Sequence, residues 1–187
     1  MRTQFWKIAG ALALGLGLMT TQAMAGDTYY KYDALGRVLL SSYPDGSQVG
    51  FAYDSAGNRS ATKRAIIAPP TTTSTLASGK GLIIGAMLTS PNLCYSLVLQ
   101  EDGNLVLYRN GVGAKWSSNT SGMNSASLVM QTDGNAVLSG PTETAGYWNS
   151  VTAGHAGAYM SLQNDGNLVI YQGSTALWSS NTALGAC

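Results

Sequence analysis

A short polar pattern occurs three times in the second half of this 187-residue chain, and it holds the side chains with the most evident chemistry. Each copy reads Gln, any residue, Asp, Gly and Asn, with Val two positions after the Asn. Asp and Asn offer adjacent acceptors and donors, Gln adds another amide, and Val adds a small apolar surface. Such a set suits the neighbouring hydroxyls and the C–H face of a pyranose ring. The copies contain Gln100, Asp102, Asn104, Val106 and Tyr108; then Gln131, Asp133, Asn135 and Val137 with Ser139 at the last position; then Gln163, Asp165, Asn167, Val169 and Tyr171.

The local sequence predicts that each copy is a β-hairpin. Two alternating apolar runs flank a three-residue loop whose third residue is Gly, which fits a type I turn followed by a left-handed Gly. Because side chains alternate along a strand, the amides, Val and Tyr of a copy share one face. The opposite face is aliphatic and is predicted to be core; in the first copy it consists of Leu97, Leu99, Leu105 and Leu107.

The polar residues also have a purely structural interpretation. Asp-Gly-Asn is a favourable turn sequence in its own right, and Asn and Gln side chains often satisfy backbone groups beside a turn. Local geometry alone leaves both interpretations open, turn formation and ligand binding.

Composition excludes several other kinds of site. Charged residues make up 10% of the chain, against roughly 25% in an average soluble domain, and the formal net charge is +1. The chain therefore lacks the basic field that nucleic acid requires. One His and two Cys leave no multi-histidine metal site or zinc cluster and little room for a Ser-His-Asp triad. We expect His155 to be a solvated loop residue, and we expect no catalytic residue, metal or cofactor.

The first 25 residues have the pattern of a secretory signal peptide. Arg2 and Lys7 precede an apolar run over residues 8–19, and an Ala-Met-Ala cleavage site ends at Ala25. The run is too short to span a bilayer, which takes about 20 residues. We predict cleavage after Ala25 and a secreted or periplasmic product without a membrane span.

Residues 26–64 contain a second, shorter repeat. The sequence YDALGR at residues 32–37 recurs as YDSAGNR at residues 53–59, with a Pro-Asp-Gly turn between them. Turns about every ten residues, separated by stretches rich in Val, Leu, Tyr and Phe, predict a β-meander. The pattern resembles the YD repeat of the Rhs family, in which many repeats build a β-strand shell. Two repeats cannot close a shell, so we expect either a stalk or docking ribbon, or a sheet packed on the next domain.

The stretch from residue 65 to residue 75 is rich in Pro and Thr and is predicted to be a linker to a domain at residues 76–187. That domain resembles the bulb-type, monocot mannose-binding lectin family. The resemblance is carried by QEDGNLVLY, QTDGNAVLS and QNDGNLVIY, which match the family signature QxDxNxVxY, and by the W-S-x-N-T runs. It implies an all-β fold, a β-prism II of three four-stranded antiparallel sheets with pseudo-threefold symmetry, here joined to a small N-terminal β-meander. It also implies that Trp116, Trp148 and Trp178 pack near the prism axis.

The resemblance further implies which residues bind sugar. In this family Gln, Asp, Asn and Tyr hydrogen-bond mannose hydroxyls, and Val packs on the ring. The first and third copies carry the whole set, so both are predicted to be carbohydrate-binding sites. The second copy is degenerate, and we predict it to be weak or silent, because the hydroxyl missing at Ser139 removes about 1 kcal/mol. Plant relatives dimerise by exchanging C-terminal strands, so a homodimer through residues 182–187 stays open.

The two cysteines, Cys94 and Cys187, are a possible disulfide pair, since export permits disulfides. A bridge closing this long loop would contribute up to about 4–5 kcal/mol. The alternative is two unpaired or intermolecular thiols, and plant relatives place their disulfide elsewhere.

These observations predict an exported lectin for mannose-containing glycans or polysaccharides, used in adhesion or surface recognition. The alternative is an Rhs/YD-related structural or antibacterial component with weak or no sugar binding. A glycosidase is disfavoured, since it needs two carboxylates about 5–10 Å apart, whereas each copy has one recurrent Asp.

Overall fold

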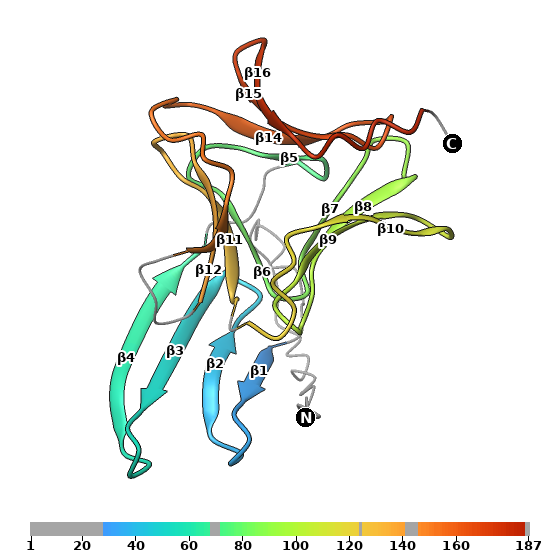
Figure 1. Cartoon of the computed structure of the whole chain (residues 1–187). Coiled ribbons are helices and arrows are strands. Elements are labelled where there is room, and N and C mark those ends of the chain that lie inside the picture. The colour runs from blue at the N-terminus through green and yellow to red at the C-terminus, as the bar shows by residue number, and fades with distance from the viewer. Residues whose placement is uncertain (1–27, 68–71, 124, 141–145, 186–187) are drawn as a thin grey trace, which may run out of the picture.

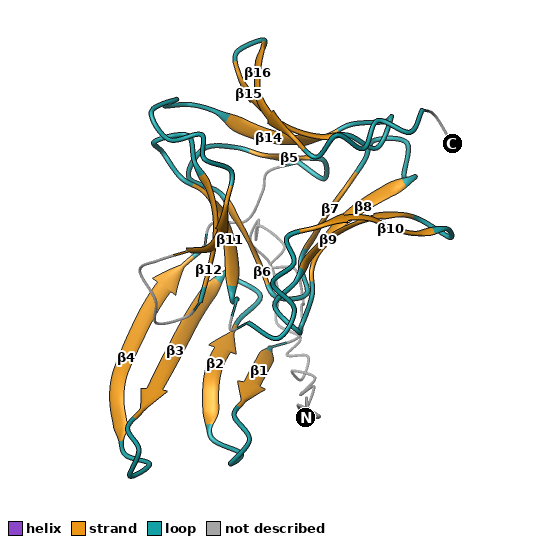
Figure 2. Ribbon diagram, in the orientation of Figure 1, coloured by secondary structure: helices purple, strands orange, loops and turns teal. Residues whose placement is uncertain are grey.

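The computed structural model describes residues 28–67, 72–123, 125–140 and 146–185, and these residues form strands, turns and loops without a helix. The strands make four four-stranded antiparallel sheets, as Figures 1 and 2 show. The N-terminal sheet contains β1 (Tyr29–Tyr32), β2 (Val38–Ser42), β3 (Ser47–Tyr53) and β4 (Arg59–Ile66). The predicted signal peptide, residues 1–25, lies outside the described residues.

The other three sheets each contain one copy of the repeat, and we number them as units one to three. Unit one is formed by β7 (Met87–Thr89), β8 (Tyr95–Leu99), β9 (Leu105–Arg109) and β10 (Gly113–Ser117). Unit two is formed by β6 (Gly81–Ile83), β11 (Ser127–Met130), β12 (Ala136–Ser139) and β13 (Gly146–Asn149). Unit three is formed by β5 (Thr75–Leu76), β14 (Tyr159–Leu162), β15 (Leu168–Gln172) and β16 (Thr175–Ser179).

The three units form the sides of a prism (Figure 1). Consecutive strands β5, β6 and β7 join units three, two and one respectively, so the segment before the first hairpin ties all three sheets together. The all-β prism of three four-stranded sheets, joined to an N-terminal meander, confirms the predicted fold class.

The core lies between the inner faces of these sheets. The aliphatic residues predicted to point inward from the first hairpin, Leu97, Leu99, Leu105 and Leu107, are each 0% exposed. Equivalent residues of the other hairpins, Leu128, Leu138 and Ile170 among them, belong to the same buried cluster. The alternation of aliphatic and polar residues therefore sets which face of each hairpin meets solvent.

The three repeated tryptophans pack against each other and against this core, as predicted. Trp116, Trp148 and Trp178 form three edge-to-face pairs with ring centroids 5.5–5.6 Å apart and an interplanar angle of 76° in each pair. Edge-to-face packing is a favoured geometry for aromatic pairs. Because the three pairs have nearly the same distance and angle, the three units are related by a near-threefold axis. These rings are therefore framework residues.

The N-terminal sheet packs on the prism beside units one and two (Figure 1). Leu40 of β2 is part of the same buried cluster as the prism core. The Gln48 side-chain Nε2 of β3 donates to the Ala126 carbonyl oxygen at 3.0 Å, and the Tyr29 ring of β1 lies against Gly85. These contacts favour the packed-sheet alternative over a free stalk. β4 ends at Ile66, inside the segment predicted as linker, and β5 begins at Thr75.

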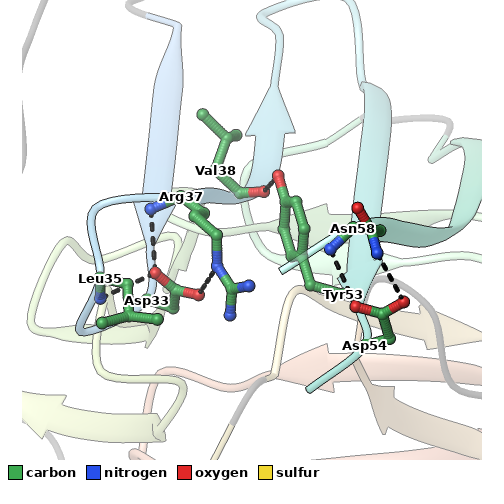
Figure 3. A network of polar contacts seen from close by, with 7 residues as sticks. All are labelled: Asp33, Leu35, Arg37, Val38, Tyr53, Asp54 and Asn58. Carbon is green, nitrogen blue, oxygen red and sulfur yellow. Dashed lines mark hydrogen bonds and ion pairs between the residues drawn. The ribbon is translucent and has the colours of Figure 1, made fainter. Parts of the chain in front are cut away.

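The two YD turns lie side by side at the end of the N-terminal sheet that points away from the prism (Figures 1 and 3). The Asp33 carboxylate accepts from Arg37 Nε at 2.6 Å and from the Arg37 backbone N–H at 2.9 Å. The Arg37 guanidinium lies 4.4 Å from the centre of the Tyr53 ring, and Tyr53 Oη donates to the Val38 carbonyl at 2.9 Å. The motif residues thus fasten one turn to the next.

We expect acid to loosen the N-terminal sheet. The pKa of Asp33 is held below its ordinary value chiefly by the backbone N–H of Arg37, that of Asp45 by the Ser47 hydroxyl, and that of Asp54 by the backbone N–H of Asn58. Since these pKa values are lower in the folded state, their stabilisation is present above about pH 4 and is lost as pH falls through the folded values. Amide exchange of β1–β4, corrected for intrinsic rates, should accelerate below pH 4 and accelerate less in Asp33→Asn.

Candidate functional site

Each hairpin of the prism closes with the same turn, and this turn places the polar residues. In unit one the Gln100 N–H donates to the Asn104 carbonyl at 2.9 Å, and the Gly103 N–H donates to the Gln100 carbonyl at 3.0 Å. Gly103 has a φ of +87°, and a Cβ there would meet the Met123 carbonyl oxygen at 2.4 Å. Glycine is therefore required for both backbone conformation and close approach. One Asp102 oxygen accepts from the Asn104 N–H at 2.9 Å, as Asp133 and Asp165 do in their turns.

The Asn side chain of each turn is held in one orientation. Asn104 Oδ1 accepts from Ser118 Oγ at 3.2 Å and from the Thr120 N–H at 3.1 Å. Asn135 and Asn167 make the same two bonds with the equivalent Ser and Thr, at 3.1–3.2 Å. With Oδ1 fixed, the Nδ2 group must point away from these partners, and it makes no hydrogen bond within the described part of the chain. Each half-buried Asn thus keeps two unused donors beside the Asp of its turn.

The Ser and Thr residues that orient each Asn are further functional candidates. They lie outside the hairpins, so the hairpin sequences alone assign them no role. Ser118 Oγ accepts from the Leu105 N–H at 3.0 Å and contacts Thr120 Oγ1 at 2.7 Å, and Thr120 Oγ1 donates to the Gly103 carbonyl at 2.8 Å. The same chain of bonds recurs through Ser150 and Thr152, and through Ser180 and Thr182. The signal in the sequence is a Ser-x-Thr that begins two residues after each of Trp116, Trp148 and Trp178, even in unit two, where the neighbouring residues differ.

We expect Ser118→Ala to weaken both the fold and site one. It removes a donor to Asn104 Oδ1 and leaves the buried Leu105 N–H without its acceptor, which costs about 1–3 kcal/mol of unfolding free energy. Ser117→Ala is the matched control, because the Ser117 hydroxyl bonds only Asn119 Oδ1 among the described residues, at 2.9 Å. Denaturant unfolding and mannoside titration of both variants check this; equal behaviour of the two would contradict it.

Gln and Tyr are paired in the two complete copies. Gln100 Nε2 donates to Tyr108 Oη at 2.8 Å, and Gln163 Nε2 donates to Tyr171 Oη at 2.8 Å. All four side chains are half-buried, whereas Gln131 of unit two, which has Ser139 in place of a Tyr, is exposed. The amide–phenol pair therefore closes one end of the polar row in units one and three and is missing in unit two.

The Val and Asp positions differ between the copies. Val106 and Val169 are 3% and 2% exposed, so they present little apolar surface, whereas Val137 of unit two is half-buried. The second Asp102 oxygen accepts from Ser121 Oγ at 2.6 Å. Within the described residues, the corresponding oxygen of Asp165 has no hydrogen bond, so site three has the more available carboxylate.

The described residues do not bring other reactive or metal-binding side chains together. His155 Nδ1 lies 3.1 Å from the Thr152 carbonyl oxygen, and the three turn aspartates belong to three different sheets. Across the described ranges, no group of three or more His, Cys, Asp or Glu is placed to hold a metal ion. None of the described residues forms a helix long and apolar enough to cross a membrane.

The C-terminal segment is fastened to unit three. The Leu184 N–H donates to the Asp165 carbonyl at 2.7 Å, and the buried Tyr95 ring donates through Oη to the Gly185 carbonyl at 2.9 Å. Cys94, next to Tyr95, is disulfide-bonded. Cys187, the partner that the sequence predicts, lies outside the described residues, and the homodimer stays a prediction.

Known proteins resemble the chain in two separate parts. The RHS Repeat family model matches residues 32–65. The Japanese Marasmius oreades lectin is 31% identical, with a TM-score of 0.57, over 64% of this chain and 98% of that one. The monomeric monocot mannose-binding lectins of Gastrodia elata are 39% identical, with a TM-score of 0.54, over 60% of this chain and 98% of theirs. The mannose-specific lectin of Dutch crocus (Crocus vernus) is 28% identical, with a TM-score of 0.50, over 60% and 98%.

No curated protein matches the chain. The solved structures, however, share both the sequence and the fold of the prism over nearly their whole length, at identities that exceed 30% in two cases. The chain therefore belongs to the bulb-type, β-prism II lectin family, whose carbohydrate-binding fold is here joined to an RHS repeat.

Proposed function

We propose that the protein is a non-enzymatic lectin that binds α-mannose-type glycans through the outer faces of units one and three. The observation that carries this proposal is the identical fixing of Asn104 and Asn167 through Oδ1, which leaves their Nδ2 donors unused within the described residues. Each of these Asn residues also donates its backbone N–H to the Asp of the same turn. A sugar hydroxyl carries one proton and two lone pairs. It can donate to the Asp and accept from the Asn at the same time, and we propose that the axial 2-hydroxyl of mannose is the group held in this way.

The Gln–Tyr pair and the Val complete the proposed contacts. Tyr Oη accepts a hydrogen bond from Gln Nε2, and its own O–H stays free to donate to a second sugar hydroxyl. Val106 and Val169 lie between this pair and the Asn on the same strand face, and at 3% and 2% exposure they offer the ring C–H groups only a small apolar contact. The mannose-specific names of the Gastrodia and Crocus proteins support the choice of sugar.

A glycan array of the protein tests this function. We expect signals on glycans with terminal α-mannose that free methyl α-mannoside competes away, and none on matched glucosides. Binding that ignores the competitor, or no mannose-dependent signal, would refute the proposal.

We expect two sites to make the protein a cross-linker. One monosaccharide contact is worth only about −4 kcal/mol, a millimolar Kd, so function requires several contacts at once. Sites one and three lie on different sheets, so they can engage different glycan chains. The protein should aggregate beads coated with single α-mannosyl groups, whereas Asn104→Asp or Asn167→Asp should bind such beads without aggregating them. Aggregation by either single variant at the wild-type concentration would show that a third site or a dimer contributes.

We also propose that the protein is exported, with residues 1–25 removed, and acts in adhesion or surface recognition. The apolar run and the Ala-Met-Ala site support this. The mature N-terminus should be Gly26 when the protein is recovered from the periplasm or medium.

The RHS repeat at residues 32–65 favours a second candidate function, an Rhs-related structural or antibacterial component. A strain without the protein that loses killing of neighbours but keeps adhesion would support that candidate.

A further inference from the structure

We propose that the degenerate second unit, together with the N-terminal sheet, forms a composite saccharide site that selects oligosaccharides over single sugars. This inference rests on the proposed lectin function and assigns a ligand class to the unit that lacks the complete motif. Its basis is a cavity of about 170 Å³ at the interface between the two parts of the chain, lined by Gln48, Lys63, Ile67, Ser127, Val129, Ser139 and Gly140.

The cavity lies where aromatic side chains fill the other units. Ser127 and Ser139 are cross-strand partners on β11 and β12. The equivalent partners in unit three are Tyr159 and Tyr171, whose rings stack with centroids 5.8 Å apart. In unit one the Ser96 partner is Tyr108. Two serines therefore leave open in unit two a space that one or two phenol rings occupy elsewhere.

The N-terminal sheet forms the other wall. Ile67, which follows β4, lies over Gly81 so closely that a Cβ there would meet Ile67 Cγ2 at 2.3 Å and Val129 Cγ2 at 3.4 Å. Gln48 is 4% exposed, and its Nε2 is fixed by Ser42 Oγ at 3.2 Å and by the Ala126 carbonyl at 3.0 Å. Its Oε1 has no partner in the described part of the chain and remains an acceptor.

The position and lining of the cavity indicate its ligand. Val137 is the cross-strand partner of Val129 and precedes Ser139 on the same strand face, so the cavity adjoins the row formed by Gln131, Asn135 and Val137. Ser127, Ser139, Gln48 and Lys63 line it beside Val129 and Ile67. These side chains supply hydroxyl, amide and ammonium groups next to apolar ones and include no carboxylate, a mixture that suits the hydroxyls and C–H groups of a neutral sugar. A mannose at Asn135 would thus extend its neighbouring sugar residue, or a substituent, into the cavity.

Isothermal titration calorimetry of the double variant Asn104→Asp/Asn167→Asp tests this site, because among the three units only unit two then keeps its Asp–Asn pair. We expect α-mannobiose or mannotriose to bind about tenfold or more tightly than methyl α-mannoside, which is about 1.4 kcal/mol. Adding Ser139→Tyr fills the cavity and supplies the missing phenol. We expect this change to bring the ratio of the two affinities close to one. Ser127→Tyr, a second filling variant, should lower the ratio in the same way.

The matched control is Tyr171→Ser in a chain that also carries Asn104→Asp and Asn135→Asp, so that unit three keeps the complete Asp–Asn pair. It opens the equivalent position in unit three, on the side of the prism away from the N-terminal sheet (Figure 1). We expect it to weaken site three without any gain for oligosaccharides. A ratio that neither Ser139→Tyr nor Ser127→Tyr changes, or no oligosaccharide binding by the double variant Asn104→Asp/Asn167→Asp, would overturn the composite site. Loss of mannoside binding by the wild-type protein would instead refute the proposed function.

Discussion

Replacing both Asn104 and Asn167 with Asp should remove mannoside binding at sites one and three while leaving the fold intact. Asp keeps an oxygen for the Ser and Thr donors that hold each Asn Oδ1. It replaces the Nδ2 donors with a second carboxylate oxygen. A sugar hydroxyl has one proton and cannot donate to two carboxylates, so one carboxylate would lose its partner in the complex.

The expected loss is at least tenfold in affinity at each site, since an unsatisfied charged acceptor costs about 1–3 kcal/mol or more. Isothermal titration with methyl α-mannoside and a thermal melt of the same sample measure binding and stability together. Asn119→Asp and Asn181→Asp are control variants, because these asparagines lie in the loops after the Trp residues and are bonded through Oδ1 to Ser117 and Ser179. Equal losses in the control pair would contradict the assignment.

Cys94→Ser should be the most destabilising single change outside the core. Removing a native disulfide from a small domain costs about 2–5 kcal/mol, which lowers the Tm by on the order of 10 °C at this size. The same change should weaken site three more than site one. The predicted bond to Cys187 would restrain the C-terminal segment. This segment carries Leu184, which bonds the Asp165 backbone, and Thr182, which bonds Asn167 Oδ1.

Calorimetric unfolding and titration of the single-site variants Asn104→Asp and Asn167→Asp, each with and without Cys94→Ser, separate these effects. The variant that keeps site three should lose affinity on disulfide removal, and the variant that keeps site one should not. A wild-type Tm that is unchanged by reductant would show that the bond is not formed in solution.

The sequence predicts the prism because its determinants are local and repeated. Alternating aliphatics such as Leu105 and Leu107 fix the buried face, Gly103 fixes the turn, and one Trp per unit fixes the period. The sequence does not predict that β5, β6 and β7 join three different sheets, because strands of two or three residues are too short to show a periodic hydrophobic pattern.

The candidate site was predictable in part. Asp, Asn and Val positions follow from the repeat and the family resemblance, and the structure places each set on one hairpin. The role of Ser118 and Thr120 depends on a contact between the turn and a loop some fifteen residues later, which pattern alone does not reveal. The docking of the N-terminal sheet depends on single contacts such as Gln48 with Ala126 and Ile67 with Gly81, which have no counterpart in the repeat.

The most direct test of the central claim is the response of side-chain amide signals to methyl α-mannoside in a ¹⁵N NMR titration. We expect saturable shifts of the Nδ2 signals of Asn104 and Asn167, whose donors are unused within the described residues. We expect no shift for Asn92 and Asn110, whose Nδ2 groups donate to the Asn164 and Leu93 carbonyls at 2.9 Å and 2.7 Å. Unmoved Asn104 and Asn167 signals at saturating mannoside, or equal shifts of all four residues, would contradict it.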